Sequence, residues 1–173
     1  IQADASGPKS ARMVLQNPRV DFAVLEVARG GILREGLGYD RNDVAVVTNV
    51  APDHLGIGGV NTLEQLADVK AVVVEAVPRN GFAVLNADDP TLRAKAAGLG
   101  ARFGRSLRVG WFAADADAPL LTAHRAGGGP TCGLRAGRMQ LARAGAGHDL
   151  GPVDGMPITV AGMAGYNVAN LCA

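Results

Sequence analysis

The sequence predicts an α/β fold in three layers, with a mostly parallel sheet between flanking helices and a small β-hairpin-rich segment attached. Two observations carry this prediction. Over residues 1–100, short apolar runs alternate with polar loops and helical patterns, which is typical of βαβ units in a parallel sheet. Beyond residue 100 glycine and alanine become abundant, and the pattern changes to short strands separated by turns.

Composition and charge narrow the classes of protein to consider. The chain has 173 residues and a formal net charge of +1, which gives no electrostatic case for a nucleic-acid or membrane partner. Cys132 and Cys172 lie far apart in the sequence, and their spacing indicates neither a disulfide framework nor a metal site. No apolar run approaches the length of a membrane span. We therefore expect a cytoplasmic protein.

The apolar run VAVV, followed by Thr48 and Asn49, predicts a central strand over residues 44–50 that is buried on both faces. Asp53 and His54 follow this strand. Open parallel sheets bind ligands beyond the carboxyl ends of their strands, and both side chains can bind a metal or move a proton. A loop carboxylate and a loop histidine without any task remain the alternative.

A first strand is predicted over residues 21–28, because Phe22 to Leu25 are all apolar. Glu26 interrupts this run. A carboxylate inside a buried strand is costly unless it is paired or bound to a cation, so Glu26 is a candidate metal ligand, or else it marks the solvated end of the strand. Arg29 and Arg34 follow in a glycine-rich loop, where they can bind carboxylate or phosphate oxygens.

A helix is predicted over residues 62–77, because Thr62 and Gln65 form a capping box and apolar residues recur at helical spacing. Lys70 falls on the apolar face of this helix. Either its stem passes the core and its amine reaches water, or the amine lies in a partly dry site where it can be chemically modified.

The remaining elements follow from similar patterns. A strand at residues 82–86 leads into a helix at 91–97 that Asp88 or Asp89 caps. We also predict strands at 101–103, 108–112 and 156–160, a hairpin of 131–135 with 138–141, and a helix from 166 that places Asn167 and Asn170 on one face. The expected division is an α/β core at 1–100, a β-rich insertion at 101–155 and a return to the core at 156–173.

The chain closely resembles the Mur-ligase-like part of the cyanophycin synthetase family, a branch of the Mur ligase and folylpolyglutamate synthetase superfamily. The resemblance rests on LEVARGGILREGLGYDRNDVAVVTNVAPDHLGIGGVNTLEQLADVKAVVVEAV, on VLNADDP and on PITVAGMAGYNVAN. It covers residues 5–97 and 156–172. The stretch ARGGILREGLG is diagnostic of this branch, whereas DH, NADD and YNVxN are shared across the superfamily.

This resemblance implies a nucleotide-binding central domain that works with ATP and Mg²⁺. In such ligases a carboxylate attacks the γ-phosphate to give an acyl phosphate and ADP, and an amine then displaces the phosphate. In the cyanophycin branch the expected reaction joins arginine to the β-carboxylate of an aspartate in polyaspartate, and the whole enzymes are usually homo-oligomers. The alternatives are a related ligase with another substrate and a non-catalytic nucleotide-binding module.

The resemblance also implies a set of site residues. The implied metal ligands are Glu26, His54 and Lys70, of which Lys70 is often carbamylated, and His54 and Lys70 are also implied to be catalytic. The implied nucleotide-lining residues are Asn86, Asn167 and Asn170. Arg29 and Arg34 are implied to hold the acidic substrate.

One departure from the superfamily pattern matters. Its members need a G-x-x-G-K-[ST] loop to cradle the phosphates, and this chain contains no Gly-Lys pair. We expect that loop to lie upstream of Ile1 in a longer protein. The chain alone is therefore expected to be inactive.

Overall fold

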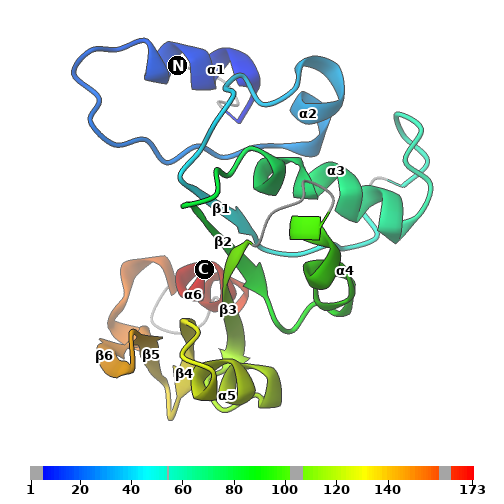
Figure 1. The fold of residues 1–173 in the computed structure, drawn as a ribbon. Coiled ribbons are helices and arrows are strands. Elements are labelled where there is room, and N and C mark those ends of the chain that lie inside the picture. The colour runs from blue at the N-terminus through cyan, green and yellow to red at the C-terminus, as the bar shows by residue number, and fades with distance from the viewer. Residues whose placement is uncertain (1–5, 54, 102–106, 160–164) are drawn as a thin grey trace.

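A six-stranded mixed sheet organises the chain (Figure 1). The computed structural model describes residues 6–53, 55–101, 107–159 and 165–173. The strands are β1 (Val44–Val47), β2 (Phe82–Asn86), β3 (Arg108–Asp115), β4 (Thr131–Arg135), β5 (Arg138–Arg143) and β6 (Ala146–Pro152). They lie side by side in chain order, with β1 to β4 parallel and β5 and β6 antiparallel. The predicted α/β class with a mostly parallel sheet is confirmed.

Helices cover the sheet and complete the layers (Figure 1). They are α1 (Pro8–Leu15), α2 (Arg29–Glu35), α3 (Leu63–Glu75), α4 (Pro90–Ala101), α5 (Pro119–Ala126) and α6 (Gly165–Cys172), with two 3₁₀ turns, η1 (Val153–Gly155) and η2 (Pro157–Thr159). Inward residues of α3, α4 and α5 share one core cluster with β1, β2 and β3, and α6 shares a second cluster with β3, β4 and β5. At β3 the sheet therefore has helices on both faces. Among the described residues, no helix is long and apolar enough to cross a membrane.

The helix α3 forms where the sequence predicts it and shows why the prediction works. Thr62 accepts a hydrogen bond from the Gln65 backbone N–H at 3.2 Å, and the Gln65 side chain accepts one from the Thr62 N–H at 3.2 Å. This capping box satisfies N–H groups that have no partner inside the helix. Leu66 and Val74 are then fully buried against the sheet, and each such burial contributes about 1.5–3 kcal/mol.

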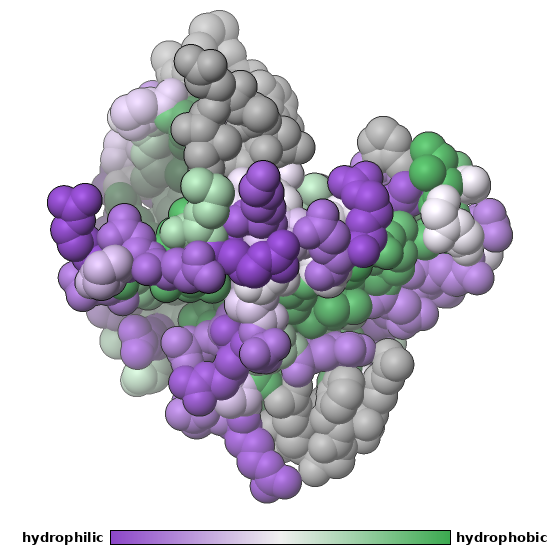
Figure 2. All heavy atoms as spheres, turned by 90° about the horizontal axis from the view of Figure 1, so that it is seen from above, coloured by the Kyte–Doolittle hydropathy of each residue, from purple (hydrophilic) through white to green (hydrophobic). Residues whose placement is uncertain are grey.

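The strand β1 lies at the edge of the sheet, and the expectation that it is buried on both faces is wrong. Ala45 and Val47 are buried, but 53% of Val44 and 42% of Val46 are exposed. The reason is that, within the described part of the chain, α3 packs on one face of β1 and the only strand paired with β1 is β2. Apolar surface shows in green between polar side chains where the molecule is seen from above (Figure 2).

The prediction of a strand at residues 21–28 is also wrong. These residues join no strand, and Phe22 and Val24 are 85% and 88% exposed. An apolar, β-prone run gives a strand only when a neighbouring strand accepts its backbone hydrogen bonds, and the described sheet ends at β1. The segment instead runs past β1 across a cavity that is described below.

The second half of the chain departs from prediction in several places. The hairpin of β4 and β5 is confirmed, and residues 108–112 lie within β3. The helix α5 and the strand β6 were not predicted. The prediction of a strand at 156–160 is wrong as far as Thr159, because backbone N–H groups close 3₁₀ turns there: that of Met156 donates to the Val153 carbonyl at 3.1 Å and that of Thr159 to the Met156 carbonyl at 3.0 Å. Ala101 ends α4 rather than starting a strand, and residues 102–106 and 160 lie outside the described residues.

The proposed division of the chain remains a prediction, although two facts bear on it. The sheet runs without a break from β2 into β3 and β4, across the expected boundary at residue 100. The helix α6 packs against β3 and β4, so the last residues lie on the same sheet.

Candidate functional site

A cavity of about 510 Å³ lies along β1 and its carboxyl end, between the segment 22–29 and α3. Glu26 and Arg29 line it from the segment, Thr48 and Asn49 from the end of β1, and Lys70 from α3. The fold therefore brings three of the predicted site residues, Glu26, Arg29 and Lys70, to one place. They come from separate parts of the sequence. The cavity reaches the carboxyl end of β1, and open parallel sheets bind ligands at the carboxyl ends of their strands.

Lys70 is held at the end of β1. Its Nζ donates to the Asn49 carbonyl oxygen at 2.9 Å and approaches Asn49 Oδ1 at 3.5 Å. The side chain is half-buried, and its amine meets the polar end of a strand inside the cavity. This geometry differs from a lysine that simply passes the core to reach bulk water, because the amine is fixed by a specific acceptor.

Glu26 reaches the same cavity but from an exposed position. The cost of burying its charge, which singled it out in the sequence, therefore does not arise in this structure. Arg29 is half-buried at the first position of α2. Arg34, in the last turn of α2, is exposed, its guanidinium lies over Gly30, and it does not line the cavity.

The donors around the cavity fit a hard cation in part. The Glu26 carboxylate and the oxygens of Asn49 are the kind of ligand that Mg²⁺ prefers. A lysine ammonium repels a cation and becomes a ligand only when it is converted to an anion such as a carbamate. His54 lies outside the described residues, and within the described part of the chain no group of three or more His, Cys, Asp or Glu side chains is placed to hold a metal. Asp53 is exposed in the loop after β1.

Asn86 and Asp88 connect the ends of three strands. The buried Asn86 donates from Nδ2 to the Thr48 carbonyl at 2.8 Å and accepts from the Asp88 N–H at 2.8 Å. Asp88 Oδ2 accepts from the Ala114 N–H of β3 at 2.7 Å. The acceptor of Asn86, Thr48, is the residue before Asn49, which holds Lys70. Both the amide nitrogen and the amide oxygen of Asn86 are therefore engaged.

Asp89 provides a second connection beside them. Its Oδ1 accepts from the N–H groups of Thr91 (2.9 Å) and Leu92 (3.1 Å), and its Oδ2 accepts from the Val50 N–H at 2.5 Å. The prediction that Asp88 or Asp89 caps this helix is confirmed, with Asp89 as the cap. The same carboxylate also fixes the chain just after Asn49.

The predicted pair on α6 lies elsewhere on the sheet. Asn167 Nδ2 donates to the Ile158 carbonyl at 2.7 Å, and Asn170 is exposed. The helix packs on β3 and β4, whereas Lys70 and Asn86 bond to Asn49 and Thr48, the two residues after β1. Asn49 is the site residue that the sequence reasoning missed. Its signal was its position directly after an apolar strand.

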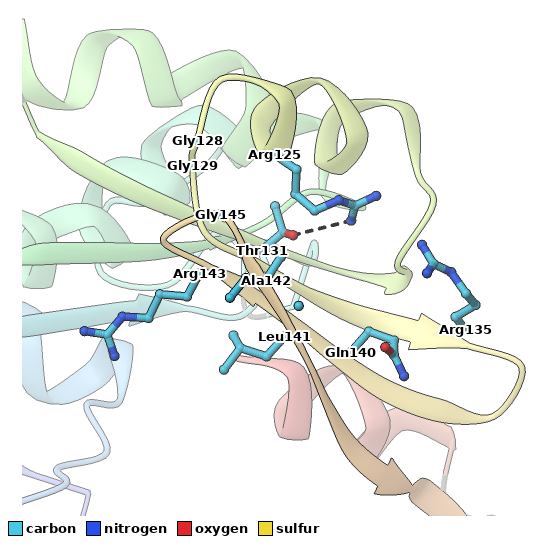
Figure 3. A pocket seen from close by; sticks show the side chains of 12 residues that line it. Arg125, Gly128, Gly129, Thr131, Arg135, Gln140, Leu141, Ala142, Arg143 and Gly145 are labelled. Carbon is cyan, nitrogen blue, oxygen red and sulfur yellow. Dashed lines mark hydrogen bonds between the residues drawn. The ribbon is translucent and has the colours of Figure 1, made fainter.

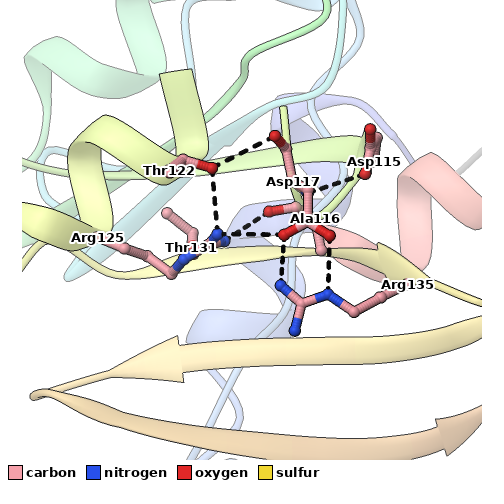
Figure 4. A network of polar contacts seen from close by, with 7 residues as sticks. All are labelled: Asp115, Ala116, Asp117, Thr122, Arg125, Thr131 and Arg135. Carbon is pink, nitrogen blue, oxygen red and sulfur yellow. Dashed lines mark hydrogen bonds and ion pairs between the residues drawn. The ribbon is translucent and has the colours of Figure 1, made fainter. Parts of the chain in front are cut away.

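A smaller hollow of about 250 Å³ lies between α5 and the strands β4, β5 and β6 (Figure 3). Arg125, Arg135 and Arg143 line it, but their guanidinium groups point in different directions. Asp117 binds two of them, with the Arg135 Nε at 2.8 Å from Oδ2 and the Arg125 Nη2 at 3.6 Å from Oδ1 (Figure 4). The hydrogen bond from Arg135 lowers the pKa of Asp117 below its ordinary value of 3.8. Because two arginines are already paired, we assign no ligand to this hollow.

The fold and the sequence place the chain in a known class of protein. The profile of the Mur ligase middle domain matches residues 4–124. The chain belongs to this family.

The chain is also similar to individual ligases. The chain is 41% identical over 170 residues to a cyanophycin synthetase of Trichormus variabilis, covering 98% of the chain and 18% of that protein. It is 41% identical over 172 residues to the cyanophycin synthetase of Synechocystis, covering 99% and 19%. A UDP-N-acetylmuramoyl-L-alanyl-D-glutamate–2,6-diaminopimelate ligase of Chlamydia pneumoniae is 39% identical over 80 residues, covering 46% of the chain and 16% of the ligase. The chain thus spans less than a fifth of the length of these relatives.

Proposed function

We propose that this chain is the nucleotide-binding middle domain of an ATP-dependent amide ligase of the cyanophycin synthetase type. One observation carries the proposal: the similarity to cyanophycin synthetases extends along 98% of the chain, whereas the similarity to the diaminopimelate ligase covers 46%. The proposed reaction joins arginine to the β-carboxylate of an aspartate in polyaspartate. The intact protein would be a cytoplasmic homo-oligomer.

The proposed chemistry has two steps. A β-carboxylate attacks the γ-phosphorus of ATP, which forms an acyl phosphate and releases ADP. An amino group of arginine then attacks the acyl carbon, phosphate leaves, and the new amide nitrogen gives up a proton. A bound Mg²⁺ would neutralise the negative charge that the phosphate oxygens carry.

Glu26, His54 and Lys70 are the proposed ligands of that cation. Support comes from the cavity that Glu26 and Lys70 share and from the contact of Lys70 with Asn49, which holds the amine at the strand end. In this proposal Lys70 acts as a carbamate, which replaces the positive charge of the amine by a negative one. Arg29 lines the same cavity and would hold the acidic substrate together with Arg34.

The nucleotide is proposed to lie along Asn86, Asn167 and Asn170. Both amide ends of Asn86 are engaged, so its contribution would be to shape the wall of the nucleotide site through Thr48 and Asp88. Asn170 is exposed and would contact the nucleotide directly. The phosphate-binding loop would come from another part of the longer protein, and we expect the 173 residues alone to show no arginine-dependent ATP turnover.

The direct test follows ADP release by the longer protein that contains this chain, with Mg-ATP and an aspartate-rich primer, with and without arginine. We expect release that needs both primer and arginine. Glu26→Ala, His54→Ala and Lys70→Ala should each lower turnover on the order of a hundredfold or more, because each removes charge control at the transferred phosphate.

A matched control is Arg12→Ala, which breaks the surface pair of Arg12 with Glu35 (3.1 Å) and should leave turnover unchanged. Release that is independent of arginine but needs another amine would favour a related ligase with a different substrate. Binding of ATP without any release would favour a non-catalytic nucleotide-binding module and would overturn the proposal.

A further inference from the structure

The two cysteines of the chain lie together in the structure although they are far apart in the sequence. Cys132 belongs to β4 and Cys172 to the end of α6, and α6 packs against β4. Both side chains are part of the apolar cluster around Phe112 and Met139. Each thiol is the largest influence on the pKa of the other, so the two lie close together in this cluster. The fold therefore creates a dithiol pair that the spacing of the residues does not reveal.

The two thiols have different surroundings. Cys172 is buried, with 4% of its surface exposed, whereas Cys132 is only partly buried. The hydrogen bond from Cys172 lowers the pKa of the Cys132 thiol below its ordinary value of 9.0, and the same bond, together with burial, raises the pKa of Cys172. Cys132 is thus the thiol that ionises first and that solvent reaches more easily. These are the properties of an attacking cysteine.

We propose that Cys132 and Cys172 form a redox-active dithiol site, which a small-molecule disulfide such as oxidised glutathione converts into an intramolecular disulfide between β4 and α6. The inference does not depend on the proposed ligase function. It rests on the packing of both thiols in one apolar cluster between α6 and β4 and on their unequal exposure.

The exchange balances in two steps. The Cys132 thiolate attacks one sulfur of oxidised glutathione, the disulfide bond of the oxidant breaks, and one glutathione leaves as a thiolate that takes up a proton. Cys172 then loses its proton and attacks the Cys132 sulfur of the mixed disulfide. The second glutathione leaves as a thiol. The protein loses two S–H hydrogens and gains one S–S bond, while the oxidant is reduced to two thiols.

The disulfide would fix the helix that carries Asn167 and Asn170 to the sheet. In the present structure apolar packing connects the end of α6 to β4. A covalent link closes the chain between residues 132 and 172 and restricts the unfolded state. Oxidation should therefore raise the thermal unfolding midpoint, by about 5 °C or more for a chain of this size.

The experiment treats the folded 173-residue chain with oxidised glutathione and measures its intact mass and its free thiols in denaturant. We expect a mass lower by about 2 Da, no free thiol, and a peptide that links Cys132 to Cys172. Cys172→Ser should stop as a glutathione adduct on Cys132, and Cys132→Ser should react more slowly because the buried thiol remains. Circular dichroism checks that both variants are folded.

Three results would overturn the inference. The wild-type chain could keep two free thiols after treatment, it could accumulate glutathione adducts as Cys172→Ser does, or it could form disulfides only between two chains. Each of these readouts is made on the wild-type chain, so a variant that fails to fold does not affect the outcome.

Discussion

Asp89 connects the segment after β1 to the start of α4. It is buried, and its two oxygens accept three backbone N–H groups, including that of Val50 at 2.5 Å. We predict that Asp89→Ala lowers the free energy of unfolding by about 3 kcal/mol, because it leaves buried donors without an acceptor and removes a helix cap. Urea denaturation monitored by circular dichroism measures this.

The control for this prediction is Asp68→Ala. Asp68 forms an exposed ion pair with Lys95 at 2.6 Å, and removing such a pair should cost less than about 1 kcal/mol. Equal losses for the two variants would show that the three hydrogen bonds of Asp89 contribute little.

At the same scale, the sequence predicts single residues well where their role is local. The capping box of Thr62 and the cap at Asp89 both depend on neighbours within a few positions, and both are confirmed. The hydrogen bond of Lys70 to Asn49 and the shared apolar cluster of Cys132 and Cys172 join distant segments. No spacing rule along the chain reports such contacts, because the fold alone creates them.

The two hairpin turns of the second half carry strain at the level of the element. Each turn has two residues, Ala136-Gly137 and Ala144-Gly145, and both residues of each have positive φ, with 49° at Ala136 and 53° at Ala144. Turns of this shape favour asparagine before glycine, and alanine is disfavoured in the left-handed region. Alanine at these positions therefore costs stability.

We predict that Ala136→Asn and Ala144→Asn each raise the free energy of unfolding by about 0.5–1 kcal/mol. The midpoint of urea denaturation is the measurement. Ala126→Asn, at the end of α5, is the matched control, because its backbone is not in the positive-φ region and asparagine gains nothing there. A fall of the midpoint in both turn variants would contradict this explanation.

Helices and strands could be predicted from the sequence where the local pattern was strong. The predictions failed where contacts with distant parts of the chain determine the secondary structure. The strand β2 and the hairpin of β4 and β5 follow from apolar runs bounded by turn residues. The helix α5 lies in a stretch rich in alanine and glycine, although Pro119 at its start and Gly127 after its end were available signals. Residues 21–28 have the composition of a strand but lack a partner in the described sheet.

For the molecule as a whole, the exposed edge strand β1 favours self-association. Val44 and Val46 present an apolar, exposed face, and an edge strand offers unpaired backbone groups to other chains. We predict that the isolated chain self-associates as its concentration rises and that Val44→Lys with Val46→Lys suppresses this. Sedimentation velocity over a concentration series measures the effect.

Ile158→Lys provides the control, because Ile158 is also about half-exposed but lies in η2, away from the edge of the sheet. If it suppresses association as well as the double variant does, general hydrophobicity rather than the edge is responsible. A wild-type chain that stays monomeric throughout the series would contradict the prediction itself.

The hydrogen bond between Val50 and Asp89 also has a spectroscopic consequence. An amide proton in a charge-assisted hydrogen bond to a buried carboxylate should resonate downfield of ordinary amides in an NMR spectrum. Val50 follows directly after Asn49, which holds Lys70 in the cavity. The Val50 amide signal should therefore shift when nucleotides, cations or bicarbonate bind in the cavity. Titrations can follow it without any label at the site.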